Sequence, residues 1–93
     1  PHVGWNKINF SNKSEKNLIS KNDGIYQYFV HSYALLHTEE NKKNTIFTTE
    51  FEGYNISSMI KKRNTIGMQF HPERSGREGL NLLADIIDSL LKR

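Results

Sequence analysis

Hydrophobic and polar residues alternate along three consecutive segments in the second half of the chain, which are residues 45–52, 54–60 and 66–70. Alternation with a period of two predicts strands that turn one face toward a core. Gly53 and the pair at 63–64 separate these segments, and the Asn of that pair tolerates the left-handed backbone of a tight turn. We therefore expect an antiparallel meander of three strands.

The most apolar stretch of the chain runs from Ile25 to Leu36, and it is interrupted only by a few residues such as His31 and Ser32. Continuous apolar character between turn residues predicts a central strand that is buried on both faces. In such a strand a histidine and a serine are either hydrogen-bonded structural groups or parts of a site. A shorter strand is expected over Val3–Ile8.

The two remaining connections are polar. Residues 9–24 predict a surface segment that Leu18 and Ile19 fix by a short helical turn, and residues 37–44 predict an exposed loop. Neither segment carries a pattern that points to chemistry.

The end of the chain predicts a helix. Ser75 and Glu78 have the spacing of a capping box, and Asp85 and Asp88 are expected on the solvent side. The expected apolar face consists of Leu80, Leu83, Ala84, Ile87, Leu90 and Leu91. Because this face needs a sheet to cover, we interpret the helix as a packing element.

A histidine and a carboxylate follow directly after the last predicted strand. Continued by one residue, the alternation of 66–70 turns His71 away from the core, and Pro72 ends the strand because it has no N–H to donate. Glu73 follows two residues after the histidine. Such a carboxylate can orient an imidazole so that its far nitrogen handles a proton, although the same pair also occurs as a purely structural contact.

The composition limits the possible functions. A chain of 93 residues without cysteine is at most one domain, and we expect part of one, encompassing residues 1–93. The first residue is proline instead of methionine, which favours a fragment, a processed product or a partial gene. The sequence has no apolar run of the ~20 residues that a membrane span needs, so we expect a soluble, cytoplasmic protein.

The net charge of +3 is spread along the chain. Small groups of Lys and Arg are separated by Asp and Glu, whereas a nucleic-acid surface concentrates its cations in one stripe. We therefore predict no binding to nucleic acid.

Three motifs resemble one protein family. They are Pro1-His2-Val3-Gly4-Trp5-Asn6, Phe29-Val30-His31-Ser32-Tyr33 and Gln69-Phe70-His71-Pro72-Glu73. Together they resemble the C-terminal half of a class I (triad) glutamine amidotransferase, and most closely the glutaminase subunit of imidazole glycerol phosphate synthase. The resemblance implies an α/β fold, namely half of a flavodoxin-like domain, with a mixed sheet, an antiparallel meander and a C-terminal helix.

The resemblance also implies catalytic and binding roles. His71 and Glu73 would be two members of a Cys-His-Glu triad whose cysteine belongs to a half of the domain outside these residues. The backbone of Ser32 and Tyr33 would bind the carboxylate of glutamine. His31 would support these two residues without contacting the substrate.

Further residues are expected at a partner interface. By resemblance, Trp5, Asn6 and Arg74 would lie where ammonia passes to a (β/α)8-barrel cyclase, although an isolated tryptophan such as Trp5 is by itself better explained as a core residue. Arg74 stands where the family often has lysine. Glutamine is the expected substrate, and no metal or organic cofactor is expected.

Three other functions remain open. The chain could be a truncated or degenerate module without turnover, or it could belong to a paralogous amidotransferase that acts on a surface-sugar precursor. His2, His31, His71 and Glu73 could alternatively converge on a metal ion.

Overall fold

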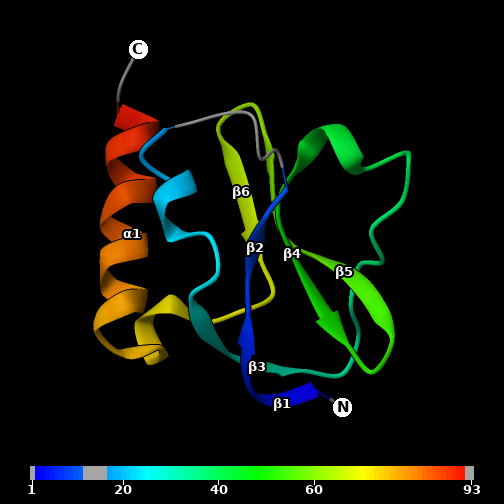
Figure 1. Cartoon of the computed structure of the whole chain (residues 1–93). Coiled ribbons are helices and arrows are strands. Elements are labelled where there is room, and N and C mark those ends of the chain that lie inside the picture. Colours follow the sequence, from blue (N-terminus) through cyan, green and yellow to red (C-terminus); the bar gives the residue numbers. More distant parts are fainter. Residues whose placement is uncertain (1, 12–16, 92–93) are drawn as a thin grey trace.

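The computed structural model describes residues 2–11 and 17–91, which form two antiparallel sheets and one long helix (Figure 1). The sheet orders are β1-β3 and β2-β4-β5-β6. The strands are β1 His2–Lys7, β2 Asn9–Phe10, β3 Tyr26–His31, β4 Thr45–Phe51, β5 Tyr54–Lys62 and β6 Thr65–Met68. The helices are the short 3-10 turns η1 Ser20–Asn22, η2 Lys42–Asn44 and η3 Pro72–Arg74, and the α-helix α1 Gly76–Leu91.

The predicted meander is confirmed. β4, β5 and β6 follow one another as antiparallel neighbours, with Thr48 opposite Ser57 and Met59 opposite Met68. β4 alternates as expected, since its odd residues Thr45, Phe47 and Thr49 are buried. The left-handed residue in the last turn is Arg63, with a φ of 59°, and not the expected Asn64.

Two details of the predicted strands are wrong. β5 does not alternate, because residues 56–59 are all buried; the buried hydroxyls of Ser57 and Ser58 are hydrogen-bonded to Thr45 and Thr49 of β4. Residues 9–24 are more than a surface connection, since β2 pairs with β4 and Phe10, Ile19 and Asn22 are buried. The part of that prediction that falls on 12–16 lies outside the described residues.

The prediction of a central strand over 25–36, buried on both faces, is also wrong. β3 ends at His31 and its only full strand partner among the described residues is β1. The inner positions Gln27 and Phe29 are fully buried, whereas Val30 on the outer face is exposed. A two-stranded ribbon has one covered face, so the apolar side chains of the other face meet solvent.

The buried face of α1 differs from the predicted one. Leu82 and Ile86 lie in the core, whereas Leu80 and Ile87 of the predicted face are exposed. The helix carries two adjacent apolar stripes, and the one that packs is selected by contact with the rest of the core. Asp85, expected toward solvent, is buried.

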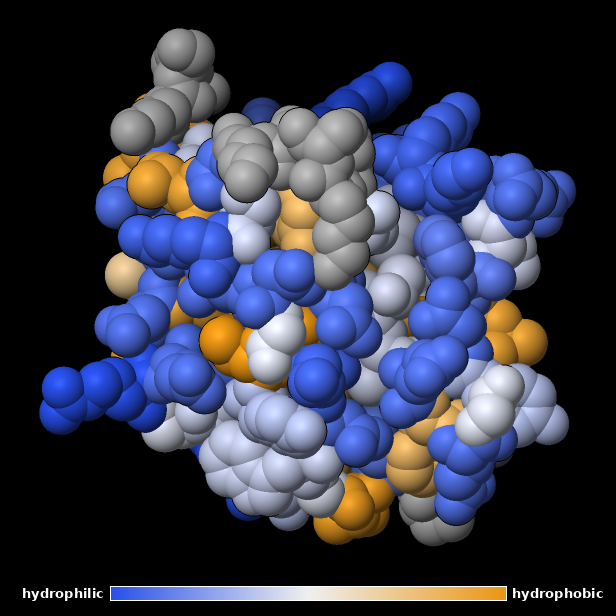
Figure 2. Space-filling view, viewed as in Figure 1, coloured by the Kyte–Doolittle hydropathy of each residue, from blue (hydrophilic) through white to orange (hydrophobic). Residues whose placement is uncertain are grey.

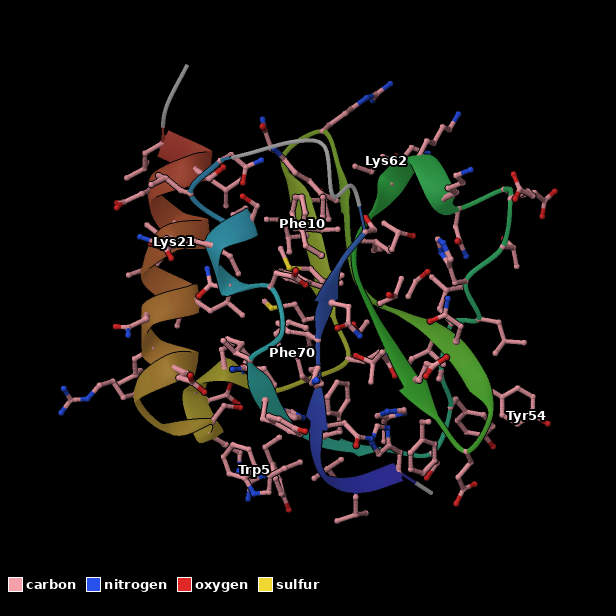
Figure 3. The ribbon with its side chains drawn as sticks, in the orientation of Figure 1. Trp5, Phe10, Lys21, Tyr54, Lys62 and Phe70 are labelled. Atoms are coloured by element: carbon pink, nitrogen blue, oxygen red, sulfur yellow. The ribbon has the colours of Figure 1, made fainter. Side chains whose placement is uncertain are left out.

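Asp85 is buried because it has partners. Its carboxylate accepts a hydrogen bond of 3.0 Å from Nδ2 of Asn22 and lies 3.5 Å from Nζ of Lys21. The buried Asn22 therefore attaches the η1 turn to the helix, and Figure 3 shows Lys21 beside α1.

One hydrophobic core joins the helix to the sheets. Figure 3 shows Phe10 and Phe70 in the space between them. The core residues are Ile8, Phe10, Ile19, Phe29, Phe47, Met59, Phe70, Leu82 and Ile86. The face seen in Figure 2 is mainly hydrophilic, with separate, small hydrophobic patches. Among the described residues, no helix is long and apolar enough to cross a membrane.

Candidate active site

His71 and Glu73 lie together at the end of the meander. Nδ1 of His71 and Oε2 of Glu73 are 3.0 Å apart, and 39% of the His71 side chain and 59% of the Glu73 side chain are exposed. A carboxylate accepts, so the neutral ring places its proton on Nδ1 and leaves Nε2 free to accept a proton. The geometry is that of an oriented, accessible base.

The strand and the turn around His71 fix its position. Phe70 is buried and pairs with Phe29 across an isolated bridge, and the N–H of His71 donates to the carbonyl of Tyr28 at 2.9 Å. Pro72 then begins η3, which is compatible with its missing N–H. The backbone of β3 therefore holds His71 in place from one side.

Ser75 fixes the same turn from the other side. Its hydroxyl donates to the carbonyl of His71 at 2.6 Å and accepts from the N–H of Tyr28 at 2.9 Å. The predicted capping role of Ser75 is not what the structure records, because one bond closes the 71–75 turn and the other joins that turn to β3. The sequence shows Ser75 four residues after His71, but this spacing alone does not indicate that its hydroxyl supports the histidine turn.

The electrostatics of the pair favour an ionised carboxylate. The pKa of Glu73 is lowered, mainly by a hydrogen bond from its own backbone and next by the hydrogen bond with His71, and the positive charge of Arg74 adds to the effect. Glu73 thus keeps its negative charge beside the ring, which stabilises the imidazolium that forms when Nε2 takes up a proton.

Ser32 and Tyr33 lie just beyond β3, and both are exposed. The strand register separates them from His71: Tyr28 is beside His71, and Ser32 is four residues further along, or about 13 Å at the rise of a strand. The structure does not bring these residues into contact with the pair. Their role in binding the substrate stays a prediction.

Two of the three residues expected at a partner interface share one surface. Trp5 is 53% exposed, so it is not a core residue, and its ring meets Tyr28 edge-on at 5.7 Å. The guanidinium of Arg74 lies over the same Tyr28 ring at 5.4 Å. Figure 3 shows Trp5 near η3.

Asn6 is placed differently, because its amide turns inward and contacts His2 at 2.6 Å. Tyr28 links Trp5 and Arg74, although the sequence pattern gave it no special role. A metal site has no support in the part of the chain that the structure describes, where no three His, Cys, Asp or Glu side chains gather.

Comparison with known proteins identifies one family. The family model "Glutamine amidotransferase class-I" matches residues 1–89. The chain is 44% identical over 89 residues to "Imidazole glycerol phosphate synthase subunit HisH 2" of Methanococcus maripaludis, covering 94% of this chain and 41% of that protein. It is 40% identical over 83 residues to the HisH subunit of Bacillus subtilis, covering 89% and 37%.

A third relative is matched along the whole chain. The HisH subunit of Thermotoga maritima is 36% identical over 93 residues, which is 100% of this chain and 41% of that protein. The chain therefore spans about two-fifths of the length of the curated relatives it matches. Since the family model covers nearly all of its residues, the chain belongs to the class I glutamine amidotransferase family.

Proposed function

We propose that this chain forms the histidine- and glutamate-bearing half of a glutaminase that hydrolyses glutamine to glutamate and ammonia. One observation carries the proposal: in a member of this family, His71 and Glu73 are 3.0 Å apart and partly exposed. The nucleophile would be a cysteine outside these residues, because the chain has none. The complete domain would have the flavodoxin-like mixed sheet, of which the antiparallel meander and α1 are one part.

The proposed reaction uses Nε2 of His71 as base and then as acid. Nε2 takes the proton of the cysteine thiol, and the thiolate attacks the side-chain amide carbon of glutamine. The C–N bond then breaks, the nitrogen leaves as ammonia with the proton from His71, and a thioester remains. Water gives a proton to Nε2 and attacks the thioester, the C–S bond breaks, and glutamate and the thiol form.

Glu73 would hold the ring throughout this cycle. Its carboxylate accepts from Nδ1, so the proton at that nitrogen does not move to Nε2 and the base keeps the useful tautomer. The lowered pKa of Glu73 supports the same role, since the ionised form is the one that accepts the hydrogen bond.

The remaining site residues would bind the substrate and a partner. The backbone of Ser32 and Tyr33 would receive the carboxylate of glutamine. Trp5, Asn6 and Arg74 would contact a (β/α)8-barrel cyclase that uses the ammonia to make imidazole glycerol phosphate in histidine biosynthesis. The relatives named above are all subunits of imidazole glycerol phosphate synthase, which favours this acceptor over a surface-sugar precursor.

A second candidate is a module that keeps the fold without turnover. The observation that favours it is the absence of cysteine from all 93 residues. Reading the DNA upstream of the Pro1 codon separates the two: an open frame with a Gly-x-Cys-x-Gly turn supports the enzyme, and a frame without such a cysteine supports the module.

An activity measurement tests the assignment of the nucleophile. The 93-residue chain by itself should release no ammonia from L-glutamine above a buffer control. Ammonia release by this chain would contradict the proposal, because no thiol is present to attack the amide.

A further inference from the structure

A chain of hydrogen bonds crosses the β1–β3 ribbon and ends on the proposed substrate-binding segment. Asn6 Nδ2 lies 2.6 Å from His2 Nε2, and His2 Nδ1 lies 2.9 Å from His31 Nε2. His31 Nδ1 in turn lies 2.9 Å from the carbonyl oxygen of Tyr33. All four ring nitrogens are therefore engaged.

The last hydrogen bond of this series determines which atom is the donor in each of the others. The carbonyl of Tyr33 can only accept, so Nδ1 of His31 must carry a hydrogen. With both rings neutral, Nε2 of His31 accepts from Nδ1 of His2, and Nε2 of His2 accepts from the amide of Asn6. One pair of tautomers thus satisfies every contact, with Nδ1 protonated on both rings.

The surroundings of His2 keep its ring fixed and neutral. His2 is 3% exposed and is stacked between Phe29, at 4.5 Å and 11°, and Phe51, at 3.8 Å and 16°. Burial is the main cause that lowers its pKa, followed by the neighbouring His31, while Glu52 acts in the opposite direction. A ring held between two aromatic planes cannot rotate without opening the core.

The segment that receives the last bond is otherwise open to solvent. Residues 32–34 are all exposed, and 89% of Tyr33 is accessible. The next backbone anchor along the chain is Leu35, whose carbonyl accepts from the N–H of Ser57 at 2.8 Å. The bond from His31 therefore fixes the backbone at Tyr33 before the chain reaches that anchor.

We propose that His2 is a positioning residue for glutamine binding, which acts by directing the His31 proton onto the Tyr33 carbonyl and so fixing the peptide that receives the substrate carboxylate. The inference rests on the proposed glutaminase function. His2 would then contribute to glutamine binding without touching the substrate, His71 or Glu73.

The tautomers provide the first test, and this test does not depend on activity. Imidazole 15N spectra of the 93-residue chain, recorded at neutral pH, should show a protonated Nδ1 and an unprotonated Nε2 for both His2 and His31. An Nε2-protonated ring at either residue would overturn the inference, since the hydrogen-bond chain could not run in the required direction.

Substitutions in the complete protein provide the second test. His2→Phe keeps the ring between Phe29 and Phe51 but cannot donate, so the KM for L-glutamine should rise about tenfold with kcat within a factor of about three. His2→Asn places an amide N–H near the position of Nδ1 and should restore part of the affinity. Val3→Ala, an exposed change on the same strand, is the matched control and should leave both constants unchanged.

The outcomes separate the two proposals. An unmodified complete protein that does not hydrolyse glutamine would refute the glutaminase function. The 15N spectra would still decide which groups donate in the hydrogen bonds from Asn6 to Tyr33. A His2→Phe variant with a lowered melting temperature but an unchanged KM would assign His2 a structural role only, and would overturn the inference.

Discussion

Replacing Gly79 by alanine tests how closely α1 approaches the turn that holds His71 and Glu73. A Cβ at Gly79 would lie 2.1 Å from the carbonyl oxygen of Pro72 and 2.7 Å from Cβ of Ser75. Ordinary contacts begin near 3.4 Å, so the turn and the helix would have to separate by about 1 Å, and overpacking of this kind costs about 1–3 kcal/mol.

The sign of the effect is informative, because alanine favours a helix over glycine by about 1 kcal/mol. Without the clash, Gly79→Ala would stabilise the protein. With it, a clash with backbone this close should cost the upper part of that range, so we expect a net loss of about 1–2 kcal/mol, or roughly 4–16 °C in melting temperature for a domain of this size.

Thermal unfolding followed by circular dichroism measures this change in the 93-residue chain. Gly67→Ala is the matched control, since its Cβ would meet the nearest atom, Cγ1 of Ile60, at an ordinary 3.5 Å, and it should not lower the melting temperature. A Gly79→Ala protein that melts at or above the wild-type temperature would refute the close approach of α1 to η3.

Three further predictions concern the helix and the buried polar groups. Leu82→Ala should cost about 2–5 kcal/mol in urea unfolding, whereas Leu80→Ala, on the exposed stripe, should cost under about 1 kcal/mol; equal costs would contradict the observed helix face. Asp85→Ala removes one of the two acceptors of the buried Asn22 amide, the other being the Ile19 carbonyl, and should cost about 1–3 kcal/mol, while Lys21→Ala removes only the ion pair made by an exposed lysine, worth about 0–1 kcal/mol. Because the pKa of His2 is lowered from 6.5 in the folded chain, the unfolded chain binds the proton first as the pH falls, so stability should decrease below about pH 6.5; a His2→Phe protein with the same pH slope would contradict this.

The sequence predicted the parts of the fold in which local pattern and burial agree. β4 has one buried face, and the sequence of such a strand alternates between apolar and polar residues. The turns of the meander were predicted from the residues between the alternating segments. The proximity of His71 and Glu73 was also predictable, because two residues separated only by Pro72 at the end of a strand have few arrangements available.

The errors arose where tertiary contacts chose between equivalent patterns. α1 carries apolar residues on two adjacent stripes, and the helix alone does not reveal that Leu82, and not Leu80, belongs to the core. Asp85 looked like a solvent residue because its partner Asn22 lies 63 positions away in the chain. An apolar run such as 25–36 also does not specify how many strands will cover it.

The hydrogen bonds of the candidate site were equally hidden. Ser75 fitted a capping box by spacing, yet its hydroxyl bonds to His71 and Tyr28. The contact of His2 with His31 depends on the register between β1 and β3, which pairs these two residues directly. Register between strands distant in sequence is set by packing, so neither contact could be derived from spacing.

The most direct test of the account is the initial rate of ammonia release from L-glutamine by the complete protein, compared with its His71→Asn variant. We expect the variant to lose at least about 100-fold in rate, while Arg77→Ala, an exposed change on α1, keeps the wild-type rate. A His71→Asn protein that releases ammonia as fast as the wild type would contradict the claim that this imidazole, held by Glu73, moves the protons of the reaction.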